Sequence, residues 1–164
     1  MQKTMTQYAF QYHVYYPDTN SVEQMVAQYG PNCFYESVDL RKTCCGVRKV
    51  EPLKRALSDK KAWFTGIRRA QSVFRANMKA FEWDEGHHIL KINPLIAWSK
   101  DQVWDYVKTY DVAYNKLHDQ GYPSIGCQPC TRAVQSGEDE RSGRWWWEEA
   151  TKKECGLHAV NIEP

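Results

Sequence analysis

The sequence contains no long apolar run, and this excludes a membrane-spanning helix, which needs about 20 consecutive apolar residues. The first residues, Met1-Gln2-Lys3-Thr4, lead into a polar stretch without the apolar region of a secretory signal. Repeats, low-complexity tracts and Gly/Ser-rich linkers are also absent, so nothing marks a second globular domain. We therefore expect a cytoplasmic protein that does not associate with membranes.

The 164 residues, 42% of them hydrophobic, are enough for one domain with a buried core. The content of 7 Trp, 10 Tyr and 5 Phe excludes a disordered chain. In a cytoplasmic protein, the six cysteines indicate metal or thiol chemistry rather than a disulfide framework.

The formal net charge of +2 conceals a strongly basic segment. Residues 41–79 contain twelve Lys and Arg against Glu51 and Asp59, a local charge of +10, so the remainder carries −8. This excess favours a polyanionic ligand, either nucleic acid or a phosphorylated small molecule. A solvated basic face would give the same pattern.

Strands and helices are expected to alternate. Composition predicts strands at residues 11–16, 62–67 and 88–93, and a helix that ends near residue 9. Capping boxes at Ser21/Gln24 and Ser99/Gln102 predict two more helices, the first ending at Gly30, and a short helix follows Pro52. This alternation predicts an α/β fold with a mostly parallel sheet, although three strands are few for such a sheet.

Two cysteine pairs are the strongest chemical signal. Cys44-Cys45 and Cys127-Gln-Pro-Cys130 can supply four thiolates, which suit either zinc or an iron–sulfur cluster. Adjacent cysteines favour iron–sulfur, because neighbouring side chains strain a zinc tetrahedron. Cys155 stands apart, with His158 three residues on, and this spacing fits a nucleophile or an inert thiol.

The sequence resembles the assimilatory adenylyl-sulfate reductases, close relatives of the phosphoadenylyl-sulfate reductases. The matching segments cover nearly the whole chain: Tyr15-Tyr16-Pro17-Asp18, Phe34-Tyr35-Glu36-Ser37, residues 41–53 (Arg-Lys-Thr-Cys-Cys-Gly-Val-Arg-Lys-Val-Glu-Pro-Leu), residues 65–72 (Thr-Gly-Ile-Arg-Arg-Ala-Gln-Ser), residues 121–132, Arg144-Trp145-Trp146-Trp147-Glu148 and residues 153–158 (Lys-Glu-Cys-Gly-Leu-His). The resemblance implies a fold of the adenine-nucleotide alpha-hydrolase-like (PP-loop) type. It also implies reduction of adenylyl sulfate to sulfite and AMP in sulfate assimilation.

The resemblance further implies which residues act. It assigns a [4Fe–4S] cluster to Cys44, Cys45, Cys127 and Cys130, and the catalytic thiol to Cys155. The residues implied around the substrate's phosphosulfate group are Lys49, Arg75, Arg141, Arg144 and His158, while Arg68 and Arg69 serve both substrate and helix ends. We interpret Trp145–Trp147 as a packing surface for the C-terminal segment, with stacking on an adenine as the alternative. The reductant would be a separate protein, thioredoxin or glutaredoxin.

The sequence departs from the family at its beginning. The family carries a Gly-rich phosphate loop after its first strand, and this chain contains none, its first glycine being Gly30. We expect the chain to start inside a helix and to lack the first strands of the sheet. Alone it would fold poorly and be inactive, because unpaired strands cost stability. We divide it into a partial nucleotide-binding domain with the iron–sulfur site, 1–140, and a C-terminal segment carrying the catalytic cysteine, 141–164.

Three alternatives stay open. The substrate could be phosphoadenylyl sulfate, although the cluster cysteines favour adenylyl sulfate. The basic segment and paired cysteines could belong to a metal-containing RNA-binding or tRNA-thiolating protein, which leaves the Glu-Cys-Gly-Leu-His sequence unexplained; we therefore expect no nucleic-acid partner. A zinc-stabilised interaction module without catalysis is the third. The sequence predicts no oligomeric state.

Overall fold

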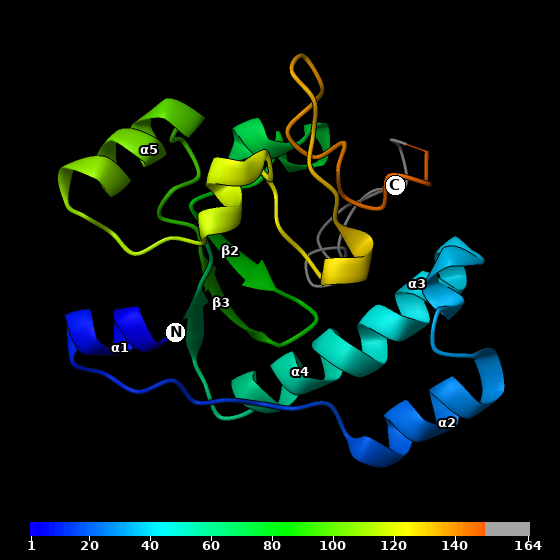
Figure 1. The fold of residues 1–164 in the computed structure, drawn as a ribbon. Helices are drawn as coiled ribbons and strands as arrows, with labels where there is room; N and C mark the ends of the chain where they lie inside the picture. The colour runs from blue at the N-terminus through cyan, green and yellow to red at the C-terminus, as the bar shows by residue number, and fades with distance from the viewer. Residues whose placement is uncertain (150–164) are drawn as a thin grey trace. The chain divides into compact units, whose positions relative to one another are not determined.

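The structure is a computed structural model that describes residues 1–149 (Figure 1). Its helices and strands follow in the order α1 (Gln2–Tyr8), α2 (Thr19–Tyr29), α3 (Val38–Cys45), α4 (Glu51–Leu57), β1 (Ala62–Phe64), β2 (Phe81–Asp84), β3 (Ile89–Ile92) and α5 (Lys100–Thr109). No helix in this described part is both long and apolar enough to span a bilayer.

The chain forms two compact units, each built from separate stretches of sequence. One comprises Met1–Val14, Ile67–Asn77 and Leu95–Trp146. The other comprises Tyr15–Gly66, Met78–Pro94 and, among the described residues, those from Trp147 on. The first unit therefore contains α1 and α5, and the second contains the sheet with α2, α3 and α4.

The sheet has the strand order β1-β3-β2. β1 and β3 are parallel, with Phe64 opposite Ile92, and β2 runs antiparallel to β3, with Phe81 also opposite Ile92. The predicted α/β class and two of the predicted strands are thus confirmed, but the sheet is mixed. β2 was not predicted, although its sequence Phe-Glu-Trp-Asp alternates apolar and charged residues as a strand does.

α3 and α4 belong to one continuous helix. The linking residues Gly46–Val50 form a π-helical turn, in which the N–H of Glu51 bonds to the carbonyl of Gly46, five residues back. Cys45, Gly46 and Val50 keep right-handed helical backbone angles. Pro52 follows at once; it lacks an N–H, so it sits where the α-helical bonding is already interrupted.

Caps at helix starts explain two boundaries. Ser99 caps α5 as predicted, its hydroxyl accepting from the N–H of Gln102 while Gln102 accepts from the Ser99 N–H. The predicted Ser21 cap is wrong: Asp18 caps α2, its carboxylate accepting from both the N–H and the hydroxyl of Ser21 at 2.8 Å. A carboxylate oxygen can accept two such bonds, and the helix begins three residues earlier than predicted.

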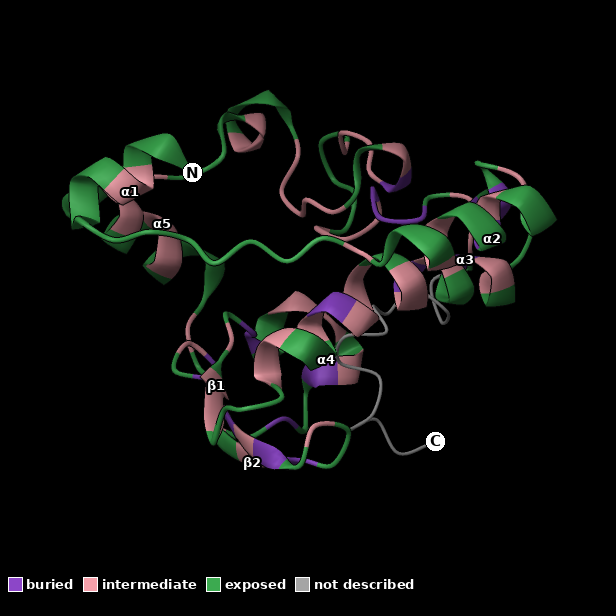
Figure 2. Cartoon of the chain, turned by 90° about the horizontal axis from the view of Figure 1, so that it is seen from below, coloured by how far each residue is buried: buried purple, intermediate pink, exposed green. Residues whose placement is uncertain are grey.

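The predicted strand at residues 11–16 is also wrong. This stretch is irregular and exposed, as Figure 2 shows in green, and no described strand pairs with it. Tyr16 and Phe10 are 76% and 41% exposed. β-forming side chains make a strand only when a neighbouring strand accepts their backbone hydrogen bonds, and the described residues offer none here.

Candidate functional site

Three of the predicted arginines lie in the segment that follows β1. Two short 3₁₀ turns, Arg69–Gln71 and Val73–Arg75, form this segment. The side-chain oxygen of Gln71 accepts from the backbone N–H of Arg68 at 3.1 Å and from the guanidinium of Arg75 at 2.5 Å. Arg68 and Arg75 are buried, whereas Arg69 is exposed. One glutamine therefore links the backbone of Arg68 to the buried guanidinium of Arg75.

Arg68 makes a second contact, with Glu140. Its Nη2 lies 3.3 Å from a carboxylate oxygen of Glu140. Its Nη1 is buried and has no hydrogen-bond partner among residues 1–149. A buried guanidinium donor is costly unless an acceptor meets it, and the oxygens of an anion are suitable acceptors.

Arg141 and Arg144 continue this cluster. Arg141 directly follows Glu140, and the backbone N–H of Arg144 donates to the carbonyl of Arg141 at 2.9 Å. The buried Arg144 guanidinium donates to the carbonyl of Ile125 at 3.2 Å and lies over the ring of Trp145, 4.7 Å from its centroid. Together the predicted arginines form a connected series within one compact unit: Arg68, Arg69, Arg75, Arg141 and Arg144.

The second cysteine pair lies in the same unit as the arginines. Cys127 and Cys130 begin and end a 3₁₀ turn closed by a bond from the N–H of Cys130 to the carbonyl of Cys127, at 2.9 Å. The N–H of Trp145 donates to the carbonyl of Cys130 at 3.1 Å. Thr131 and Arg144 form an antiparallel bridge. The cysteine turn and the Arg144 segment are thus one structural piece.

The first cysteine pair lies in the other unit, at the end of α3. Cys45 is buried and Cys44 half-buried. Burial raises the pKa of the Cys44 thiol, the neighbouring Cys45 raises it further, and Arg48 partly offsets this. Lys49, half-buried, lies in the π-helical turn four residues after Cys45. Among the described residues, it is the predicted substrate-binding cation that lies outside the unit containing the arginines.

The thiols fit a soft metal site by their chemistry. None of the five cysteines of the described part is in a disulfide, and each predicted pair has one buried cysteine. The two pairs belong to different units, and no three His, Cys, Asp or Glu side chains among residues 1–149 converge on a metal position. Thiolates are preferred ligands of soft metals, so these pairs suit iron or zinc.

An ion pair that the sequence analysis missed lies in the second unit. Nε and Nη2 of Arg41 donate to the two carboxylate oxygens of Glu148 at 2.7 and 3.0 Å. Both residues occur in segments that carry the family resemblance, but they are 107 positions apart and no local pattern joins them.

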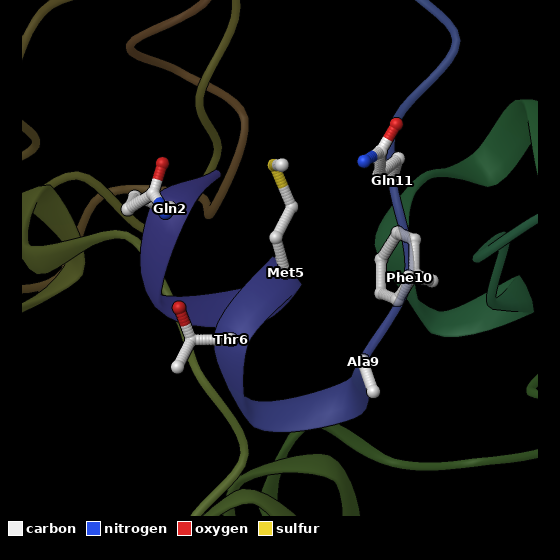
Figure 3. A pocket seen from close by; sticks show the side chains of 6 residues that line it. All are labelled: Gln2, Met5, Thr6, Ala9, Phe10 and Gln11. Carbon is white, nitrogen blue, oxygen red and sulfur yellow. The ribbon is translucent and has the colours of Figure 1, made fainter.

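A pocket beside α1 contains none of the predicted residues (Figure 3). It is lined by Gln2, Met5, Thr6, Ala9, Phe10 and Gln11, all uncharged, and therefore does not suit an anionic nucleotide. The predicted catalytic residues Cys155 and His158 lie outside the described residues, and their roles stay predictions.

Comparison with known proteins places the chain. Residues 1–133 match the family described as "Phosphoadenosine phosphosulfate reductase domain". The chain belongs to this family. The matched residues include all four paired cysteines and Lys49, Arg68, Arg69 and Arg75.

Curated relatives within the family carry the name adenosine 5'-phosphosulfate reductase. The proteins from Burkholderia cepacia and Allochromatium vinosum are 55% and 53% identical over 96% and 92% of this chain. The relative from Rhizobium tropici is 49% identical over 95% of this chain and 87% of its own length. This chain spans 63% and 59% of the first two relatives.

A solved structure supports the fold. Phosphoadenylyl-sulfate reductase from Candida auris, in complex with phosphate, is 32% identical, with a TM-score of 0.62. The match covers 81% of this chain and 62% of the Candida auris chain. The predicted PP-loop-like α/β fold is therefore confirmed.

Proposed function

We propose that the protein containing this chain reduces adenylyl sulfate to sulfite and AMP in sulfate assimilation. The observation that carries the proposal is the buried guanidinium of Arg68, which lies beside Glu140 and retains a donor free for an anion's oxygen, while its backbone N–H shares the Gln71 side chain with the guanidinium of Arg75. Family membership and the names of the relatives support the same reaction class.

The reaction begins with the Cys155 thiolate. It attacks the sulfur of the substrate's sulfonate group, a new S–S bond forms, the S–O bond to the phosphate breaks, and AMP leaves. A thiolate of the reductant then attacks the Cys155 sulfur of the S-sulfocysteine, sulfite departs with the bonding electron pair, and a mixed disulfide forms. The second thiol of the reductant resolves it, so its dithiol becomes a disulfide and Cys155 is restored.

Cations are needed because an anionic thiolate approaches a dianionic group. Arg68, Arg75 and Arg144, all buried, would stabilise the charge that develops on the phosphate as the S–O bond breaks. The remaining proposed contacts to the phosphosulfate group come from Arg69, Arg141, Lys49 and His158. His158 would also hold Cys155 as a thiolate.

Cys44, Cys45, Cys127 and Cys130 would hold a [4Fe–4S] cluster. When bound, the cluster would supply an electrostatic contribution rather than electrons. The charge of Lys49, four residues after Cys45, would couple that site to the substrate. The proposed reductant is thioredoxin or glutaredoxin, and the proposed location is the cytoplasm, where such dithiols are kept reduced.

The matched family and the Candida auris structure favour phosphoadenylyl sulfate as a second candidate substrate. The ratio of kcat/KM for the two nucleotides separates the candidates. We expect the ratio to favour adenylyl sulfate.

The test uses the natural-length protein, with its start fixed by intact mass, purified without oxygen. With thioredoxin, it should release sulfite from adenylyl sulfate, and Cys155→Ser should abolish release while retaining iron. Cys33→Ser is the matched control and should keep both. Absence of sulfite release, zinc in place of iron and sulfide, or salt-dependent RNA binding would overturn the proposal.

A further inference from the structure

We propose that the Arg41–Glu148 ion pair anchors the C-terminal segment to the helix carrying Cys44 and Cys45, and thereby positions Cys155. The inference rests on the proposed function, because only there is Cys155 the nucleophile. Arg41 and Glu148 would be positioning residues, acting through the segment that they hold.

The pair has the geometry of a rigid attachment. Two hydrogen bonds, 2.7 and 3.0 Å long, join the guanidinium to both carboxylate oxygens. The Arg41 side chain is 0% exposed and that of Glu148 is 4% exposed. A bidentate, desolvated pair fixes the relative orientation of the elements it joins far better than an exposed pair does.

The helical spacing links this attachment to the cysteines. Arg41 precedes Cys44 by three residues and Cys45 by four on α3. Residues with this spacing lie on the same helix face. Glu148 is therefore held against the face of α3 from which the two cysteines project.

A second contact strengthens the anchor. The ring of Trp147 lies 4.4 Å from that of Tyr35 and 6.4 Å from that of Phe34, measured between centroids. Phe34 is buried, in the 3₁₀ turn Cys33–Tyr35 that packs against α3. Two consecutive residues, Trp147 and Glu148, thus contact the same part of the fold, as expected for a tryptophan run that packs the C-terminal segment.

The anchor limits where Cys155 can lie. Cys155 follows Glu148 by seven residues, and a fully extended chain of that length spans at most about 25 Å. Fixing Glu148 removes much of the conformational freedom that the thiol would otherwise lose when it meets the substrate.

A direct role of Arg41 in substrate binding is disfavoured. Its guanidinium is fully buried and already faces a carboxylate. The neighbouring pocket, about 250 Å³ in volume, is lined by Glu36, Glu148 and Glu149, whose charges repel an anionic nucleotide. The pair therefore holds protein segments together rather than substrate.

Two substitutions test the proposal in the natural-length, iron-loaded protein. Glu148→Gln keeps the shape of the side chain but removes its charge, and Arg41→Lys keeps the charge but loses the two-pronged geometry. We expect each to slow S-sulfonate formation on Cys155, followed by intact mass without thioredoxin, about 10- to 100-fold. KM for adenylyl sulfate should change less than about twofold, because the substrate arginines are intact.

A matched control uses a more exposed bidentate pair, Arg132 with Glu138, at 2.9 and 2.7 Å and about one-third exposed. Glu138→Gln should leave the rate of S-sulfonate formation unchanged. If Glu148→Gln does not fold, Glu148→Asp retains the charge and should give a smaller loss of rate. Measurements are made per iron-loaded molecule, so lost folding alone cannot mimic the effect.

Hydrogen exchange at the amides of residues 146–149 provides a readout independent of turnover. Faster exchange in Glu148→Gln, together with the slower reaction, supports the proposal. Unchanged exchange, or an unchanged rate with only a lower Tm, overturns it. If the unaltered protein forms no S-sulfonate, the proposed function fails, and the proposed positioning of Cys155 fails with it. Faster exchange in Glu148→Gln would in that case still establish that the ion pair anchors residues 146–149.

Discussion

The guanidinium of Arg144 occupies the space into which a side chain at position 126 would project, and Gly126 leaves that space free. The Arg144 guanidinium also lies over the ring of Trp145 and donates a hydrogen bond to the carbonyl of Ile125. The absence of a side chain at Gly126 therefore makes room for a buried cation that we propose binds substrate.

Gly126→Ala should displace the Arg144 guanidinium, because the added methyl group overlaps it. We expect KM for adenylyl sulfate to rise about tenfold, a loss of roughly 1.4 kcal/mol of binding, with a small change in kcat. Steady-state kinetics measure this. Gly46→Ala is the control, since a Cβ there meets nothing within 4 Å, and an equal rise in KM in that variant would contradict the assignment.

Glu140→Gln should lower the free energy of unfolding but increase the stabilisation that adenylyl sulfate gives on binding. The substitution removes the carboxylate 3.3 Å from buried Arg68, so the remaining cation costs about 1–3 kcal/mol. An anionic ligand compensates for that cost on binding. Thermal unfolding with and without adenylyl sulfate should therefore show a larger rise in Tm for Glu140→Gln than for the unaltered protein, and a smaller rise would refute the idea.

Cys130→Ser should abolish iron binding, whereas Cys33→Ser should not. An iron–sulfur cluster of the proposed type holds about four iron atoms through four thiolates, and loss of one ligand destabilises it. Iron and acid-labile sulfide analysis after anaerobic purification measures this. Full iron content in Cys130→Ser would remove Cys130 from the proposed ligand set.

The pKa of Asp18 should lie below its ordinary value of 3.8, because the N–H and then the hydroxyl of Ser21 donate to its carboxylate. Asp18 then stabilises α2 at pH values above 3.8, and this contribution is lost as the pH falls through the lowered pKa. A carboxyl NMR titration measures it. Ser21→Ala should raise the pKa of Asp18 but keep it under 3.8, because the backbone N–H of residue 21 still donates to the carboxylate. An unchanged pKa would show that the Ser21 hydroxyl does not lower it.

Features fixed by neighbouring residues could be predicted from the sequence. The Ser99 cap and the end of α2 at Gly30 depend on local hydrogen bonds, and strands β1 and β3 are marked by their composition; all four were predicted correctly. The strand at 11–16 failed because a strand also depends on a distant partner. The arginine assignments came from the family resemblance. The sharing of Gln71 by Arg68 and Arg75, and the Arg41–Glu148 pair, required three-dimensional structure.

The π-helical turn at Gly46–Val50 changes how this stretch tolerates insertions and deletions. A π-turn holds one residue more than an α-helical path of the same kind, and each residue turns an α-helix by about 100°. Because the π-helical turn absorbs this extra residue, the cysteine-bearing face of α3 and the face of α4 that buries Pro52 keep nearly the angular phase of a regular helix one residue shorter. Deleting one residue there should therefore make the helix regular and leave Pro52 in register with the cysteines, whereas a further residue taken up as α-helix would turn the two faces apart by about 100°.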